Sequence, residues 1–180
     1  ITAEKLESNV TYRANLDKLE SDIIIFSGYT SIVNHNIIQN KKCLNIHYSL
    51  LPKYRGLHST VWAILNEEKY LGYTIHEMNQ FIDDGDIIFQ KKFKNDKFSS
   101  ATSYIKQFNN DVEKKLGNLV IRYINGEIKP IKQDKSKASW VGKRNLEDCR
   151  INFSETINQI LLLFRVLQYP YPLPFFTHQG

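Results

Sequence analysis

The sequence lacks several features that would define large classes of protein. No apolar run approaches the roughly 18 residues that a membrane-spanning helix requires. The N-terminus, ITAEKLESNV, has neither the basic segment nor the apolar stretch of a targeting peptide. We therefore expect a soluble, cytoplasmic protein with no membrane partner.

Cysteine is scarce, and no residues are spaced for metal binding. The 180 residues include two cysteines, Cys43 and Cys149, which are far apart and form no CxxC pair. This excludes a disulfide framework and a structural zinc site. His35, His58 and His76 show no metal-ligand spacing with cysteine or acidic residues, so we expect no metal.

A dense basic surface is also absent. The net charge is +5, but the lysines are scattered in pairs at 41, 91 and 114 and form no continuous stripe. Nucleic-acid binding would favour such a stripe. We therefore do not expect a nucleic-acid partner, and a phosphorylated small molecule is sufficient to explain the charge.

The apolar residues that are present predict a compact α/β domain. Hydrophobic residues make up 42% of the chain and aromatics 12%, which is enough for a packed core. SDIIIFSGY (21–29) is a short apolar run typical of a strand buried on both faces of a parallel sheet. Strands are also expected in CLNIHYS (43–49), YTIHEM (73–78) and GDIIFQKKF (85–93). Alternating with helices, they predict a Rossmann-like, mostly parallel sheet with flanking helices.

Helical periodicity is clearest between residues 99 and 124, where Ser99 or Ser100 can cap the helix. We expect a second helix in 58–72, ended by Gly72, and another in NFSETINQILLLFRVLQ (152–168). The polar, basic stretch 129–139 is typical of a linker. The predicted division is a catalytic core over 1–128, a linker over 129–139 and the start of a C-terminal subdomain over 140–180.

Polar side chains follow the predicted strands where a ligand site would form. Asn45 and His47 are two residues apart in a strand, so they project from the same face. Asp83 lies in the turn NQFIDDGD, two residues before Gly85. Ligands of open α/β sheets bind at the carboxyl ends of strands, so we expect the three side chains to converge.

These motifs resemble the formyltransferase family that uses N10-formyltetrahydrofolate. NIHYSLLPKYRG, followed by a tryptophan-bearing helix and YTIHEMNQFIDDGDIIFQ, resembles its Asn-x-His strand end, Ser-Leu-Leu-Pro segment and Asp-x-Gly turn. The resemblance covers about residues 22–92 and implies that Asn45, His47 and Asp83 are catalytic. Family members begin with further strands, so the first part of the sheet is expected to be absent from this chain.

The chemistry accounts independently for these residue types. Formyl transfer to an amine passes through a tetrahedral oxyanion, which needs a hydrogen-bond donor and a group that manages protons. Asn45 can donate to the oxyanion, and His47 can assist it or accept an amine proton. Asp83 can orient the imidazole and is expected to raise its pKa. No nucleophilic side chain is required.

The resemblance implies that the folate donor lies between two loops. One loop follows the strand IIIFSGY and the other precedes the catalytic aspartate. The residues expected there are Tyr29, Thr30, Ser31, Val33, Met78, Gln80, Phe81, Ile82 and Asp83.

For the acceptor, the sequence is most similar to the family members that formylate nucleotide-linked amino sugars, such as dTDP-amino-dideoxyhexoses used in lipopolysaccharide O-antigen biosynthesis. Cationic Lys53 and Arg55 are expected to meet phosphates, and an aromatic segment is expected to stack on a base. The residues expected to bind substrate are Lys53, Tyr54, Arg55, Gly56, Tyr169, Tyr171 and Phe175.

Two alternatives remain open at this stage. One is a methionyl-tRNA formyltransferase, although the region 53–60 lacks the inserted basic loop that tRNA binding would favour. The other is a folate- or nucleotide-binding module without catalysis, which the intact Asn45, His47 and Asp83 disfavour. A homodimer through the C-terminal region is also consistent with the resemblance.

Overall fold

The computed structural model describes residues 20–169 and 171–178. Residues 1–19, Pro170 and residues 179–180 lie outside this description. They include the beginning of the core predicted over 1–128 and one proline of the predicted aromatic segment.

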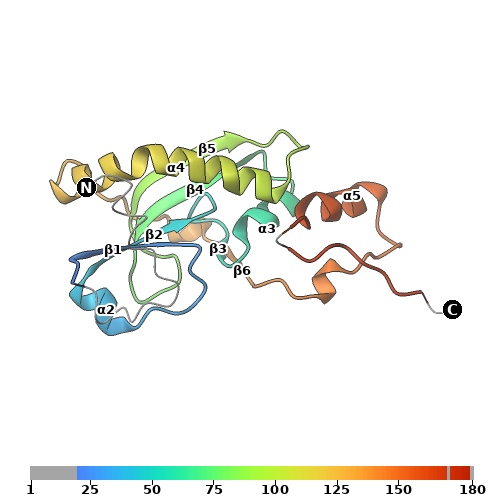
Figure 1. The fold of residues 1–180 in the computed structure, drawn as a ribbon, viewed down its shortest axis with the longest axis horizontal. Coiled ribbons are helices and arrows are strands. Elements are labelled where there is room, and N and C mark those ends of the chain that lie inside the picture. Colours follow the sequence, from blue (N-terminus) through green and yellow to red (C-terminus); the bar gives the residue numbers. More distant parts are fainter. Residues whose placement is uncertain (1–19, 170, 179–180) are drawn as a thin grey trace.

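In the described part of the chain, four strands form the main sheet in the order β1–β2–β4–β5 (Figure 1). β1 and β2 run parallel, whereas β4 is antiparallel to both β2 and β5. The predicted α/β sheet with flanking helices is therefore confirmed, and in the described residues it is mixed. The strands are β1 (Ile23–Ser27), β2 (Lys42–His47), β4 (Tyr70–Glu77) and β5 (Ile87–Lys94).

A second, two-stranded sheet lies beside the first. Its strands, β3 (Arg55–Gly56) and β6 (Trp140–Val141), pair in parallel although they are more than 80 residues apart in sequence. The pairing brings the chain that follows β2 next to the C-terminal third of the chain.

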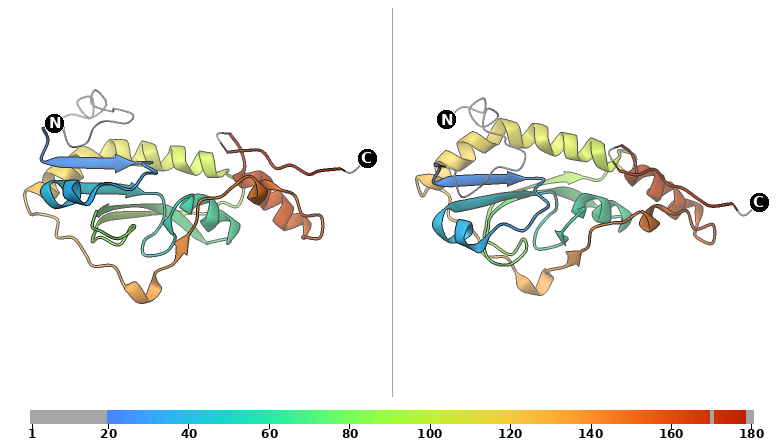
Figure 2. Two further views of the ribbon diagram at one scale, coloured as in Figure 1. Left: turned by 90° about the horizontal axis from the view of Figure 1, so that it is seen from below. Right: turned by 60° about the horizontal axis from the view of Figure 1, so that its bottom comes forward.

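Helices cover the main sheet and extend beyond one end of it. The long helix α4 lies along one side of the sheet, and α5 lies at the C-terminal end of the molecule (Figures 1 and 2). None of the helices in the described ranges is long and apolar enough to cross a membrane. The helices are α2 (His35–Asn40), α3 (Ser59–Leu65), α4 (Ala101–Ile124) and α5 (Ile157–Val166), with short 3-10 helices at Lys135–Lys137 and Glu147–Cys149.

The helix predicted over 99–124 is confirmed as α4. Ser100 is its N-cap, and the Ser100 Oγ accepts a hydrogen bond from the backbone N–H of Ser103 at 3.1 Å. Residues at helical spacing turn one face of α4 into the core. The buried residues of this face are Ala101, Tyr104, Phe108, Val112 and Leu119.

The helix predicted over 58–72 is shorter than expected. α3 ends at Leu65, and Gly72 lies inside β4 instead of stopping a helix. A Cβ at position 72 would lie 2.1 Å from the carbonyl oxygen of Lys91 on the neighbouring strand. The glycine therefore serves close strand packing, which helical periodicity cannot reveal.

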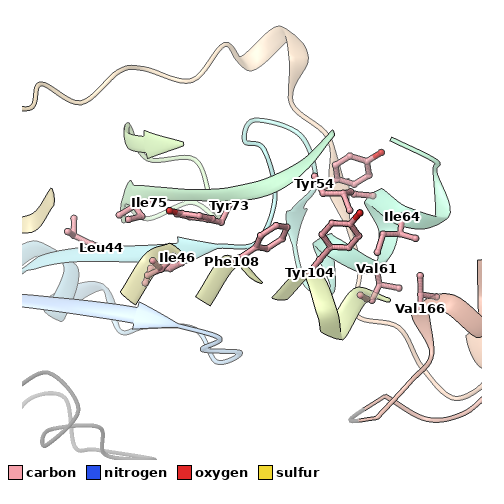
Figure 3. Packing of buried hydrophobic residues seen from close by; sticks show 14 of the residues in the cluster. Leu44, Ile46, Tyr54, Val61, Ile64, Tyr73, Ile75, Tyr104, Phe108 and Val166 are labelled. Carbon is pink, nitrogen blue, oxygen red and sulfur yellow. The ribbon is translucent and has the colours of Figure 1, made fainter. Parts of the chain in front are cut away.

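The main core lies between the sheet, α3, α4 and α5. Figure 3 shows Leu44 and Ile46 of β2 beside Tyr73 and Ile75 of β4, with Phe108 of α4 against them. The same cluster continues through buried side chains of α3 to Val166 of α5. The C-terminal helix is therefore anchored to the core by its last turn.

The segment predicted as a linker, 129–139, is mostly exposed but is attached to the rest of the fold at two points. It passes across the molecule on the side away from α4 (Figure 2, left). Ile131 pairs with Ile87 through two backbone hydrogen bonds, and the Gln133 side chain is buried. The division into a core, a linker and a C-terminal subdomain stays a prediction.

Phe108 is expected to be a principal packing residue. Its ring has no exposed surface and lies 5.1 Å from the ring of Phe93 and 6.0 Å from that of Tyr104. We expect Phe108→Ala to lower the free energy of unfolding by about 3–5 kcal/mol in urea denaturation, since it removes a buried aromatic side chain.

The matched control is Phe98→Ala, because the Phe98 side chain is 90% exposed. We expect that change to stay within about 0.5 kcal/mol. Equal losses for the two variants would show that this core does not support the fold.

Candidate active site

Strand β2 is buried and ends in the predicted polar pair. Asn45 and His47 lie on the same face of β2, as the two-residue period requires. In the antiparallel pairing with β4, Asn45 is opposite His76 and His47 is opposite Thr74. The sheet register therefore adds a second imidazole beside the predicted pair.

The Asp83 carboxylate joins these side chains. Its Oδ1 accepts a hydrogen bond from Asn45 Nδ2 at 3.1 Å and lies 3.4 Å from His76 Nε2. Its Oδ2 accepts a hydrogen bond from the backbone N–H of Gly56 at 2.8 Å and lies 3.5 Å from His47 Nδ1. The predicted convergence of Asn45, His47 and Asp83 is therefore present in the geometry.

The turn that carries Asp83 has an unusual backbone. Asp83 has φ +50°, in the left-handed region that aspartate tolerates better than most residues. A Cβ at Gly85 would lie 1.8 Å from the carbonyl oxygen of Glu77. The glycine two residues after Asp83 is thus required by the close approach of the turn to the end of β4.

Gln133 and Arg55 hold this turn from behind. Gln133 Nε2 donates to the carbonyl oxygens of Asp83 and Gly85 at 2.8 and 2.7 Å. Its Oε1 accepts from Arg55 Nη2 at 2.7 Å, and Arg55 Nη1 forms an ion pair of 2.6 Å with Asp84. The conformation of the catalytic turn therefore depends on a segment 50 residues further along the chain.

This arrangement corrects the phosphate-binding role expected for Arg55. The residue is 3% exposed, and its guanidinium is held by Asp84 and Gln133 and lies 5.4 Å from the Trp140 ring. A buried guanidinium that is already paired cannot meet a substrate phosphate without breaking these contacts. Arg55 anchors the turn that carries Asp83 instead.

The carboxylate of Asp83 is ionised across the physiological pH range. Burial alone would raise the pKa of Asp83, but the neighbouring imidazoles of His76 and His47 and the hydrogen bond from the N–H of Gly56 outweigh it. Together they hold the pKa of Asp83 at about 2. The site thus contains a fixed negative charge between two imidazoles.

His47 behaves differently from the expectation based on its carboxylate neighbour. Burial lowers the pKa of His47 below its usual value, and the Asp83 carboxylate and the Tyr54 carbonyl offset this only in part. His47 Nε2 lies 2.7 Å from the carbonyl oxygen of Tyr54, so this nitrogen carries a hydrogen. In the neutral ring Nδ1, which faces Asp83, is therefore the free base.

The two loops expected to bind the donor come together in space. Val33, after β1, and Met78, after β4, pack in one small cluster with Phe26 and Cys43. Tyr29, Thr30 and Ser31 of the first loop are exposed, as are Gln80, Phe81 and Ile82 of the second. The expected donor residues thus provide an apolar and aromatic surface next to Asp83.

The residues expected on the acceptor side differ in accessibility. The Lys53 side chain is 53% exposed and pairs with Glu68 at 2.9 Å. Tyr54 is buried, with its hydroxyl donating to Glu68, and the N–H of Gly56 is taken by Asp83. Of these three, only Lys53 has a largely exposed side chain, and its ammonium group is already paired.

The aromatic segment near the C-terminus is only partly free. Tyr169 is 87% exposed, whereas Tyr171 packs edge-on against His58 with ring centroids 5.6 Å apart. Phe175 lies 4.8 Å from the guanidinium of Arg150. Base stacking by Tyr171 or Phe175 would have to replace these contacts, so Tyr169 is the accessible candidate of the segment.

Two residues of the site were not identified from the sequence. His76 lies on β4, where residues 71–75 are all buried as well. A buried polar side chain in such a strand needs hydrogen-bond partners, and this is itself a sign of a polar site. Gln133 lies in a basic, loop-like stretch with no periodic signal. Within residues 20–169 and 171–178, no group of three or more His, Cys, Asp or Glu side chains is arranged to hold a metal ion.

The chain belongs to the formyl transferase family, whose sequence profile matches residues 2–121. A curated relative, the methionyl-tRNA formyltransferase of Clostridium tetani, is 32% identical over 171 residues, which cover 92% of this chain and 54% of that protein. The chain thus spans about half the length of that relative.

Solved structures with the same fold include proteins described with different substrates. A sugar N-formyltransferase from a Shewanella species superposes with a TM-score of 0.70 at 25% identity, over 87% of this chain and 65% of that one. HypX from Aquifex aeolicus, solved with tetrahydrofolic acid, gives a TM-score of 0.73 at 21% identity, over 83% of this chain and 26% of that one. The HypX likeness supports the fold alone.

The anchoring role of Arg55 predicts a stability defect. Arg55→Met leaves the nearly buried Asp84 carboxylate without its closest partner and is expected to lower the free energy of unfolding by about 3 kcal/mol. The control Lys53→Met removes a half-exposed ion pair and should change it by less than about 1 kcal/mol. Urea denaturation measures both. Unchanged stability of Arg55→Met, with a KM increase for the acceptor only, would restore the phosphate-binding role.

The pKa of His47 can be measured directly by NMR titration of its imidazole. We expect a pKa below about 6.5, the ordinary value, because burial disfavours the charged ring. Asp83→Asn should lower it further, since the carboxylate is the group that favours the protonated ring. The control Asp86→Asn changes a charge in the same turn and should leave the titration unchanged. A pKa above the ordinary value, or one unaffected by Asp83→Asn, would contradict this account.

Proposed function

We propose that the chain forms the transfer centre of an N-formyltransferase, which moves a formyl group from N10-formyltetrahydrofolate to the amino group of a nucleotide-linked amino sugar. The observation that carries the proposal is the hydrogen-bonded cluster of Asn45, His47 and Asp83 beside two converging, partly apolar loops. Membership of the formyl transferase family supports the same chemistry.

The geometry is suited to direct attack by the amine. An attacking amine must lose a proton, and the Nδ1 of neutral His47 is the base available for it. The resulting imidazolium would lie between the Tyr54 carbonyl and the Asp83 carboxylate, and both of these favour the positive charge. His47 therefore acts as the proton acceptor in the proposed reaction.

Asn45 is suited to stabilise the oxyanion on the transferred carbon. One of its amide N–H groups is donated to Asp83 Oδ1, which orients the amide plane. The second N–H faces His76 Nε2 at 3.3 Å, and this longer contact can be exchanged for the oxyanion. Asn45 supplies a donor that is already aligned before substrate binds.

A covalent enzyme intermediate is not part of the proposal. Cys43 and Cys149 are both buried, and burial raises the pKa of each thiol. A buried thiol with a raised pKa is a poor nucleophile. This supports transfer in a single passage through the tetrahedral state.

The donor residues fit a folate in chemical character. Exposed Tyr29, Phe81 and Ile82 can cover the ring system, and backbone groups of the two loops can recognise its polar edge.

The choice of a nucleotide-linked sugar over methionyl-tRNA rests on the surface next to the centre. Residues 48–54 form a short turn between β2 and β3. Lys53 of this turn is paired with Glu68, and Arg55, which follows it, is buried. A tRNA needs many phosphate contacts, whereas a nucleoside diphosphate needs few. The name of the Clostridium tetani relative favours tRNA as the second candidate.

The wider setting follows from the same proposal. A dTDP-amino-dideoxyhexose used in lipopolysaccharide O-antigen biosynthesis would be formylated in the cytoplasm. A homodimer through the C-terminal region finds support in the exposed apolar residues Ile157, Leu161 and Phe164 of α5.

The proposal is tested by assaying the whole protein with N10-formyltetrahydrofolate and a panel of nucleotide-linked amino sugars, with methionyl-tRNA as the comparison. We expect His47→Ala and Asp83→Ala to remove most turnover and Asn45→Ala to lower kcat about a hundredfold, as for one oxyanion donor. His35→Ala, which changes an exposed histidine of α2, is the control and should keep wild-type kcat.

Two results would count against the proposal. Formylation of methionyl-tRNA but of no sugar would replace the acceptor. Near wild-type kcat in His47→Ala would remove this residue from the mechanism.

A further inference from the structure

His76 touches the transfer centre without being one of the three expected catalytic residues. It is 1% exposed and lies opposite Asn45 in the β2–β4 pairing. Its Nε2 is 3.3 Å from Asn45 Nδ2 and 3.4 Å from Asp83 Oδ1, and its Nδ1 is 2.7 Å from the carbonyl oxygen of Glu77. Asn45 and Asp83 belong to the centre, and Glu77 is the next residue of the strand that carries His76.

The hydrogen bond at Nδ1 determines what Nε2 can do. A carbonyl oxygen only accepts, so Nδ1 carries the hydrogen that is donated to Glu77. In the neutral ring, Nε2 is then an acceptor directed at the Asn45 amide. The tautomer of His76 is thus set by its own strand, independently of substrate.

The Asn45 amide has one consistent orientation in this environment. An ionised carboxylate and an imidazole lone pair both accept, so the group between Asp83 Oδ1 and His76 Nε2 must be the NH2 of Asn45 and not its carbonyl. Asp83 alone would bind one N–H and leave the amide free to tilt about that bond. The second acceptor restricts this motion.

The backbone at this point is irregular. In the β4–β5 pairing, Ile75 is opposite Phe89 but His76 is opposite Ile87, so the register skips one residue of β5 at His76. Such bulges change the direction in which side chains project and are frequent beside active sites. The irregularity therefore coincides with the residue that contacts the centre.

We propose that His76 is a positioning residue for formyl transfer, which accepts the second N–H of Asn45 before substrate binds and so holds the amide in the orientation from which this N–H is exchanged to the oxyanion. This inference rests on the proposed function. A merely structural histidine would need only its bond to Glu77. The contact of Nε2 with the Asn45 amide supports the positioning role instead.

The test compares three variants of the whole protein. His76→Met removes both ring nitrogens at similar volume, whereas His76→Gln keeps an acceptor that can reach the Asn45 amide. Ile75→Val is the packing control, because Ile75 is buried next to His76 in the strand and belongs to the main core. Urea denaturation of all three shows how much stability each change removes.

We expect His76→Met to lower kcat about tenfold to a hundredfold, the range for losing an oriented hydrogen bond in a site. The KM values for donor and acceptor should stay within about twofold, because His76 acts through Asn45 and not on the substrates. His76→Gln should recover most of the loss, and Ile75→Val should keep wild-type kcat.

A second measurement needs no turnover. In the ¹⁵N spectrum, His76→Met should shift the side-chain amide protons of Asn45, which are assigned by their disappearance in Asn45→Ser. His76→Gln should shift them less, and Ile75→Val should leave them in place. This reports directly on the amide that His76 is proposed to hold.

Three outcomes would overturn the inference: unchanged kcat in His76→Met, losses that only follow stability in all three variants, or unmoved Asn45 amide resonances. If the wild-type protein formylates no amine, the proposed function fails. The amide spectrum then decides the role of His76 by itself.

Discussion

The Asp83 carboxylate is the group on which the centre depends. It is nearly buried and charged, and a charge in such a place is tolerated only when several polar groups satisfy it. Its partners come from β2, β3 and β4, so satisfying this carboxylate links strands of both sheets. The same contacts align the amide of Asn45 and the base of His47. One electrostatic requirement therefore organises both the local fold and the chemistry.

A network of buried polar side chains holds the turn that carries this carboxylate. Gln133 bonds two carbonyls of the catalytic turn, and Arg55 links Gln133 to Asp84. Such a buried network is stable only when most of its members are paired. It ties the segment 129–139, which resembles a linker in composition, to the geometry of the turn that carries Asp83. Arg55, the basic residue that follows β2, thus stabilises the backbone of the Asp83 turn and leaves no free charge for a substrate.

The proposed transfer centre has a proposed donor side and a proposed acceptor side, which differ in character. The donor side is formed by two loops that share a small apolar cluster and expose aromatic and aliphatic side chains. The acceptor side has few free charges, because its cations are buried or paired and most of its aromatic residues have partners within the chain. A flat, partly apolar donor matches the first side, and a compact acceptor with few phosphates matches the second. This difference in charge is the main physical reason to propose a nucleotide-linked sugar and not a tRNA as acceptor.

The sequence alone determined the features that depend on neighbours in the chain. The two-residue period placed Asn45 and His47 on one face, the 3.6-residue period with a serine cap defined α4, and Asp-Asp-Gly marked the catalytic turn. Only the tertiary structure decided which residues from distant segments meet. The position of His76 follows from an antiparallel register between residues 31 apart, and the burial of Arg55 follows from a strand pairing across more than 80 residues. The direction of the His47 pKa shift was likewise a tertiary property. It depends on how much water the whole fold excludes, and no local pattern in a sequence records that quantity.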